Sequence, residues 1–149
     1  MLCFYCFQNS HRTEPQVKDK HGRIVNPFPE VRDILADLSA AGVVLGVASR
    51  TTEVKGARKL IETLGWDKYL THKEIYPGCK ITHFENLKKC TQFRYSEMLF
   101  FDDEERNIRD LTSIGVVSIL VDDRGVNRKS LRDGLLRFAK ERGNKPETQ

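Results

Sequence analysis

The sequence predicts an α/β fold built on one parallel sheet with helices on both faces. Amphipathic segments alternate with short apolar runs, in the order helix then strand repeated four times and closed by a fifth helix. This alternation is typical of parallel strands joined by right-handed helical crossovers, which bring the carboxyl ends of the strands to one edge. With 149 residues and 39% hydrophobic content, the chain suits one globular domain with its own core.

Residue spacing and local signals locate the five helices. The first begins at Pro29, where the missing N–H of proline is tolerated, and ends at Gly42. Thr82 and Glu85 form a capping box that opens the third helix. Apolar residues at helical spacing mark helices at residues 31–41, 54–64, from 82 onward, 108–114 and 131–139.

Apolar runs predict buried strands at residues 43–48, within 69–76, at 98–101 and at 116–121. Residues 17–27 are expected to form a loop around Gly22 and Pro27, and residues 1–16 follow no periodic pattern. The predicted organisation is an atypical N-terminal segment, 1–16, an α/β domain, 17–142, and a flexible polar tail, 143–149.

Composition argues against several classes of protein. The net charge is +4, but basic and acidic residues are interspersed, so no nucleic-acid footprint is expected. No apolar run approaches membrane-spanning length, and the apolar start lacks the basic region and cleavage site of a signal peptide. Cys3 and Cys6 form a lone C-x-x-C with no second pair to complete a zinc site, and Cys79 and Cys90 are interpreted as incidental thiols. We expect a monomer in the cytoplasm, with the nucleus left open.

Two adjacent carboxylates follow one of the predicted strands. The apolar run Leu99-Phe100-Phe101 ends abruptly in Asp102 and Asp103. At the carboxyl edge of a parallel sheet, where ligands bind, paired carboxylates are hard oxygen ligands suited to Mg²⁺. The alternative is that both residues only cap the following helix, since Asp is a favoured N-cap.

A hydroxyl and a lysine are predicted at the same edge of the sheet. Ser49 directly follows the strand 43–48, and Lys80 follows the short strand within 69–76. Hydroxyls and helix-terminal N–H groups bind phosphate oxygens, and an ammonium neutralises phosphoryl charge. Each residue has a simpler interpretation, Ser49 as a helix cap and Lys80 as a solvated lysine. The joint arrangement favours a phosphoryl-transfer site.

The order hydroxyl, lysine, acidic pair at successive strand ends resembles the haloacid dehalogenase (HAD) superfamily of phosphohydrolases. The chain is similar to the eukaryotic magnesium-dependent phosphatase family of that superfamily, most closely in residues 48–51, 72–84 and 100–108, and more broadly over 17–142. The resemblance implies a three-layer Rossmann-like fold. It also implies magnesium-dependent hydrolysis of phosphomonoesters, with phosphotyrosine or sugar phosphates as substrates.

The resemblance also assigns roles to individual residues. Ser49 and Arg50 would bind the substrate, with the Ser49 hydroxyl on the phosphoryl group. Lys80 would stabilise the transferring phosphoryl group and the nucleophile, acting in both substrate binding and catalysis. Asp103 would be the direct magnesium ligand and Asp102 its supporting partner, and Asp102 would also count with Lys80 as a catalytic residue.

The first motif of the family, an apolar strand ending in D-x-D-x-T, does not occur in this sequence. The resemblance makes its first Asp the nucleophile and its second the general acid and base. Here Gln8 and Asn9 follow the apolar run 2–7 instead, so Mg²⁺ binding is expected to be weak or lost. The missing motif normally supplies the central strand of the sheet. Either residues 2–7 replace that strand, or buried backbone groups lose their partners.

Three hypotheses about function follow. The first is a HAD-type phosphatase that is impaired or inactive because its start has been exchanged, as an alternative first exon or an imperfect gene model would do. The second is a non-catalytic module that uses Ser49, Arg50 and Lys80 to bind phosphate or a protein. The third, a nucleotide-binding or receiver-like domain, lacks a G-x-G-x-x-G or Walker loop and a phospho-acceptor Asp on a central strand.

Overall fold

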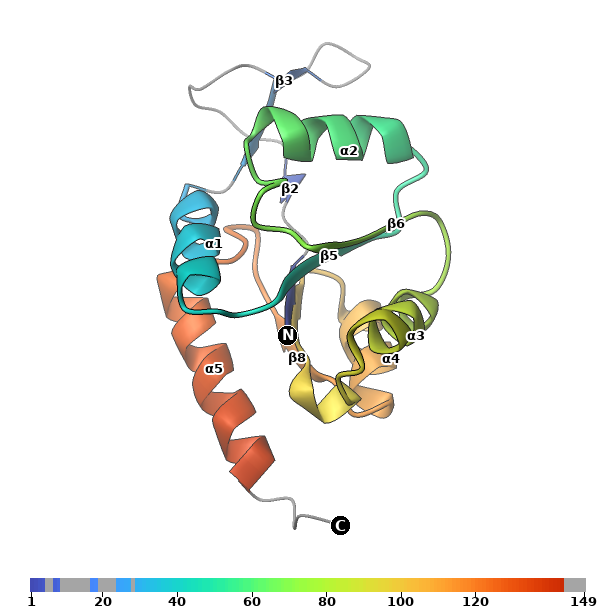
Figure 1. The fold of residues 1–149 in the computed structure, drawn as a ribbon, viewed down its shortest axis with the longest axis vertical. Coiled ribbons are helices and arrows are strands. Elements are labelled where there is room, and N and C mark those ends of the chain that lie inside the picture. The colour runs from blue at the N-terminus through green and yellow to red at the C-terminus, as the bar shows by residue number, and fades with distance from the viewer. Residues whose placement is uncertain (5–6, 9–16, 19–23, 28, 144–149) are drawn as a thin grey trace.

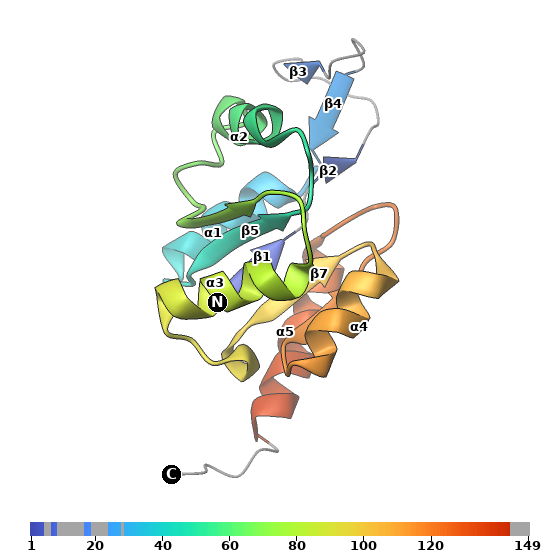
Figure 2. The ribbon, with the colours of Figure 1, turned by 90° about the vertical axis from the view of Figure 1, so that its right-hand side faces the viewer.

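The computed structural model describes residues 1–4, 7–8, 17–18, 24–27 and 29–143. A five-stranded parallel sheet lies at its centre, in the strand order β6-β5-β1-β7-β8 (Figures 1 and 2). The strands are β1 (Leu2–Phe4), β5 (Leu45–Ser49), β6 (His72–Ile75), β7 (Leu99–Asp102) and β8 (Val117–Leu120). Every residue of β5 and β7 is buried, which confirms the prediction that their apolar runs form strands buried on both faces of the sheet.

The helices form layers on the two faces of this sheet. They are α1 (Val31–Ala40), α2 (Val54–Thr63), α3 (Lys80–Thr91), α4 (Glu105–Ser113) and α5 (Arg128–Gly143), with a short 3₁₀ helix, η1 (Tyr95–Glu97), before β7. The apolar residues of α1 and α5, joined by Ile61 of α2, pack against Leu99 and Phe101 of β7. Phe84 and Leu111, from α3 and α4, pack against Phe100 on the opposite face. The expected three-layer α/β fold is therefore confirmed.

The central position of the sheet is occupied by β1. Its residues pair in parallel with both neighbours, so that Cys3 lies opposite Gly46 of β5 and Phe100 of β7. Residues at the start of the chain thus supply a central strand. Its bounds are Leu2–Phe4; residues 5–6 of the predicted run 2–7 lie outside the described residues, and Phe7 belongs to another strand. Any apolar segment can meet this requirement, because the ladder uses backbone N–H and C=O groups and not particular side chains.

A second, three-stranded antiparallel sheet follows β1 in the chain. It has the order β2-β4-β3, with β2 at Phe7–Gln8, β3 at Val17–Lys18 and β4 at Ile24–Pro27. The expectation of a loop over 17–27 is therefore wrong for the described part of that segment. Pairings of two residues are too short to show periodicity, although Val17 and Ile24 are β-branched and favour extended backbone.

Two helix starts also differ from the predictions. Helix α3 begins at Lys80, with Cys79 as its N-cap, so Thr82 lies inside the first turn and donates its N–H to the Cys79 carbonyl. Helix α5 begins at Arg128 because Asn127 and Ser130 exchange hydrogen bonds between side chain and backbone just before the apolar stripe. Gly143, placed in the predicted tail, is the last residue of α5, while residues 144–149 lie outside the described residues.

None of the described helices combines the length and apolar character needed to cross a membrane. Among the described thiols, Cys79 is partly exposed and Cys90 is exposed, and both are free. Cys6 lies outside the described residues.

Candidate active site

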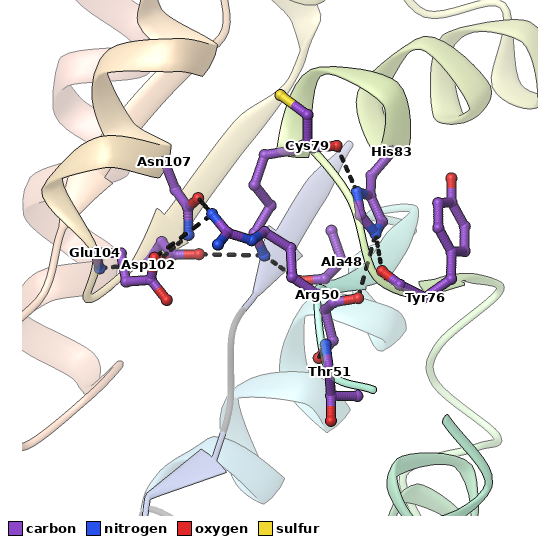
Figure 3. Close-up of polar contacts among 11 residues, drawn as sticks. Ala48, Arg50, Thr51, Tyr76, Cys79, His83, Asp102, Glu104 and Asn107 are labelled. Carbon is purple, nitrogen blue, oxygen red and sulfur yellow. Dashed lines mark hydrogen bonds and ion pairs between the residues drawn. The ribbon is translucent and has the colours of Figure 1, made fainter. Parts of the chain in front are cut away.

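The carboxyl edge of the sheet brings together three residues that are distant in sequence. Ser49 ends β5, Lys80 begins the helix that follows β6, and Asp102 ends β7. Figure 3 shows the surroundings of Asp102 at this edge. Strand β1 lies between β5 and β7, so its carboxyl end points into the same region. The strand order therefore brings the three residues to one edge of the sheet, as the sequence predicts.

Lys80 and Asp102 form a buried ion pair. The Lys80 Nζ lies 3.2 Å from the Asp102 Oδ2, and both side chains are only 1% exposed. The ammonium also donates to the backbone carbonyl of Ala48, one residue before the end of β5. The interpretation of Lys80 as a solvated lysine is therefore wrong. A cation this deeply buried is held by its partners, because isolated buried charges are strongly disfavoured.

The two carboxylate oxygens of Asp102 have different environments. Oδ1 accepts hydrogen bonds from the Glu104 N–H at 2.8 Å and from the Asn107 Nδ2 at 3.1 Å. Oδ2 accepts no hydrogen bond among the described residues and faces the Lys80 ammonium. The bond to the Glu104 N–H lies at the start of α4, so Asp102 both orders the start of the helix and forms the ion pair.

Asn107 connects Arg50 to this pair. Its Oδ1 accepts from the Arg50 Nη1 at 2.9 Å, while its Nδ2 donates to Asp102 (Figure 3). Arg50 also lies 3.6 Å from the Glu104 carboxylate. Sequence reasoning did not identify Asn107, which is 2% exposed on the first turn of α4. Its position five residues after Asp102 is a weak signal, because only the folded chain shows that both ends of its amide are used.

Ser49 is 4% exposed, and its backbone and side chain are both engaged. Its hydroxyl oxygen accepts a long hydrogen bond from the Thr51 N–H at 3.4 Å, and its carbonyl accepts the Tyr76 N–H at 3.1 Å. The weak contact leaves the hydroxyl free to donate. The backbone contacts fix the end of β5 against the segment after β6.

A second polar cluster lies behind Ser49. The Tyr76 hydroxyl donates to the Glu74 carboxylate at 2.6 Å and accepts from Asn86 at 2.7 Å. Burial, followed by the hydrogen bond to Glu74, raises the pKa of Tyr76 to about 12. The Tyr76 ring stacks on His83, which is fully buried. Sequence reasoning assigned no role to these residues, since a histidine on the inner face of a helix has no signal of its own.

Asp103 differs from its neighbour in being exposed. Partial desolvation of its carboxylate, and then the adjacent charge of Asp102, raises the pKa of Asp103. Such a carboxylate gains from a nearby cation. No cluster of three or more metal-ligating side chains occurs among the described residues, so Asp102 and Asp103 form at most part of a metal site there. The described residues by themselves do not fit a complete magnesium site.

Taken together, the described edge offers a buried ammonium, a guanidinium, a hydroxyl and the N-terminus of a helix. Groups of these kinds are the ones that bind an anion with several oxygens, such as a phosphoryl group, in proteins. The geometry thus defines an α/β protein with a cationic, hydrogen-bonding site at the carboxyl edge of its sheet.

Comparison with solved structures finds the same fold in other proteins. The chain superimposes on a β-phosphoglucomutase from Clostridium difficile with a TM-score of 0.61 and 14% identity, covering 76% of this chain and 58% of the other. A phosphatase domain from Bacteroides fragilis, solved with Mg, gives a TM-score of 0.61 at 16% identity, covering 69% and 29% of the two chains. At these identities the likeness concerns the fold.

Sequence comparison identifies the family. A family model described as acid phosphatase matches residues 3–141. Human magnesium-dependent phosphatase 1 is 46% identical over 124 residues, which are 83% of this chain and 70% of the human protein. A HAD-like hydrolase superfamily protein of Schizosaccharomyces pombe is 32% identical over 107 residues, covering 66% of this chain and 62% of that protein. The chain belongs to the acid phosphatase family within the HAD superfamily.

Proposed function

We propose that this chain binds phosphomonoesters at the carboxyl edge of its sheet and that its hydrolytic activity is impaired. The observation that carries the proposal is the buried Lys80 ammonium, 3.2 Å from Asp102 at the start of α3. Asp102 and the Ala48 carbonyl hold this ammonium in place before any anion binds, so its charge is already oriented at the edge of the sheet. The names of the human and yeast relatives, a phosphatase and a hydrolase, support a phosphorylated ligand.

Each residue at the edge has a distinct role in this proposal. Lys80 offsets the charge of the phosphoryl group, and Asp102 keeps the ammonium charged and oriented. The Ser49 hydroxyl donates to a phosphoryl oxygen. Arg50, held by Asn107 in the free protein, turns to the phosphate when it is present, since charge-assisted bonds to phosphate are stronger than those to a neutral amide.

The impairment follows from the residues that come after β1. In the phosphatase family that this chain resembles, a carboxylate at the end of the central strand attacks phosphorus, and a second carboxylate acts as the general acid and base. In this sequence Phe4 is followed by Tyr5, Cys6, Phe7 and Gln8, none of which is a carboxylic acid. The side chains that bind phosphate are thus present without the group that would react with it.

Magnesium is part of the proposal as a weakly held cofactor. Asp103, and Asp102 through its Oδ2, would hold the ion in this chain. When bound, the ion would neutralise charge on the phosphoryl oxygens. Two carboxylates, one of them already paired with Lys80, make a poor site for a hard divalent ion. The human relative is named magnesium-dependent, and we propose that this dependence is weakened here.

The second candidate is a non-catalytic module that binds phosphorylated groups. It is favoured by the same observation, because the Lys80–Asp102–Asn107–Arg50 network is intact without a nucleophile. The two candidates differ only in residual turnover. Phosphotyrosine or a sugar phosphate as ligand, a monomeric state and a cytoplasmic location are further parts of the proposal.

Binding of inorganic phosphate, measured by calorimetry, tests the proposal. Arg50→Ala should weaken binding by about tenfold, because a charge-assisted hydrogen bond is removed. Arg58→Ala makes the same charge change at an exposed position of α2 and should leave the affinity unchanged. If the two variants bind phosphate equally well, the edge of the sheet is not the phosphate site.

A further inference from the structure

His83 lies behind the proposed phosphate site and touches three separate segments. Its Nδ1 is 2.8 Å from the Cys79 carbonyl oxygen, and its Nε2 is 2.9 Å from that of Tyr76 and 3.2 Å from that of Ser49 (Figure 3). The ring is fully buried. His83 therefore joins the end of β5, the segment after β6 and the N-cap of α3.

All three partners of the ring are backbone carbonyls, which only accept hydrogen bonds. A neutral imidazole has one N–H, so its other nitrogen would direct a lone pair at a carbonyl oxygen within 2.9 Å. In a buried site such a contact is repulsive and leaves the bare ring nitrogen without a donor, even where the carbonyl has other donors, as Cys79 has in the Thr82 N–H. An imidazolium, which donates from both nitrogens, satisfies every contact.

The surroundings suit a positive ring. Tyr76 stacks face to face on it, with centroids 4.2 Å apart and an interplanar angle of 7°, and the face of an aromatic ring attracts cations. The hydroxyl of that tyrosine is bonded to the Glu74 carboxylate, which adds negative charge to the same cluster. Among the described residues, Glu74 is connected to the ring through Tyr76, and Lys80 lies three positions earlier on the same helix.

We propose that His83 is a doubly protonated positioning residue, which fixes the segments carrying Ser49 and Lys80 and adds a buried positive charge behind the bound phosphate. This inference rests on the proposed function for its effect on binding, but not for the state of the ring. Its contacts hold the carbonyl of Ser49 and the residue just before Lys80. A shift of either segment would move the hydroxyl and the ammonium apart.

The state of the ring is tested in the unmodified protein by ¹⁵N NMR of its histidine side chains at pH 7.0. The expected spectrum shows both nitrogens of His83 protonated, with equivalent imidazolium shifts. One protonated and one bare nitrogen would overturn the proposal. This measurement needs no ligand, so its result is independent of whether phosphate binds at the edge.

The effect on binding is tested with sulfate, whose charge is constant between pH 5 and pH 9. His83→Gln should reduce sulfate affinity by on the order of tenfold, because a unit charge near the anion is lost. Thr82→Ala, on the exposed side of the same turn, should leave it unchanged. Equal affinity in a folded His83→Gln variant would overturn the positioning role. Absence of sulfate binding in the unmodified protein would instead contradict the proposed function.

Discussion

Replacing Lys80 with methionine should destabilise the fold by about 3–5 kcal/mol, the usual result of removing one partner from a buried ion pair. Methionine fills a similar volume, so the loss reports the charge and not a cavity. At the observed 3.2 Å separation, two unit charges in an effective dielectric of about 20 attract by about 5 kcal/mol. After the substitution, the Asp102 Oδ2 would be buried with no described partner.

Urea denaturation followed by circular dichroism measures this change. The matched control is Lys59→Met, which removes an exposed lysine paired with Glu62 at 3.4 Å and should change stability by less than about 0.5 kcal/mol. The double variant Lys80→Met/Asp102→Asn should be about 2–3 kcal/mol more stable than the sum of the two single changes predicts. If Lys80→Met is no more destabilising than Lys59→Met, the ion pair is not buried as the structure has it.

Three further predictions concern packing, charge and chemistry. Gly134→Ala in α5 should destabilise the fold by roughly 1–3 kcal/mol, because a Cβ there would lie 2.6 Å from the buried Phe101 ring. Gly56→Ala, in the exposed part of α2, should instead stabilise the fold by about 0.5–1 kcal/mol. If thermal unfolding shows that both substitutions change stability in the same direction, the packing of α5 on Phe101 is contradicted. Asp103→Asn should raise the free energy of unfolding at pH 7 by less than about 1 kcal/mol, because the raised pKa of Asp103 means that its charge opposes folding above that pKa. This gain in stability should vanish as the pH falls through 3.8, the ordinary pKa of an aspartate. Urea titrations at several pH values measure it, and a gain in stability that grows on acidification would contradict the prediction. The double variant Tyr5→Asp/Phe7→Asp places two carboxylates, two residues apart, after β1. It should hydrolyse p-nitrophenyl phosphate faster than the unmodified chain in the presence of Mg²⁺, whereas the control Tyr5→Asn/Phe7→Asn should not. Equal rates in the two variants would mean that the missing acids do not limit activity.

Much of the fold can be predicted from the sequence because its elements are marked locally. Helix α1 has an apolar stripe between Pro29 and Gly42, and β5 and β7 are continuous apolar runs. The convergence of Ser49, Lys80 and Asp102 follows from one rule, that parallel strands end at a common edge. These features depend on sequence neighbours and strand order alone.

The features that could not be predicted depend on contacts between distant segments. The pairings of β2, β3 and β4 span two residues each, which is too short for a periodic signal. Asn107 and His83 are polar residues on helices, and their burial comes from Arg50, Ser49 and Tyr76 folding against them. Lys80 has the sequence appearance of a surface lysine, and only the position of β7 gives it a buried partner.

Strand β1 shows that the fold and the chemistry have different requirements. A central strand needs apolar residues and a backbone able to pair on both sides, which Leu2–Phe4 provide. The hydrolytic mechanism implied by the family resemblance needs carboxylates after that strand, and residues 5–8 contain none. A phosphatase fold can therefore persist in a chain that we propose to be chemically impaired.

Hydrolysis of p-nitrophenyl phosphate by the folded chain, with Mg²⁺ and with EDTA, tests this account most directly. We predict no magnesium-dependent turnover above the rate of the Asp103→Asn variant, from a protein that still binds inorganic phosphate. Turnover that requires Mg²⁺ and is abolished by Asp103→Asn would contradict the account, because it would show that another group in this chain attacks phosphorus.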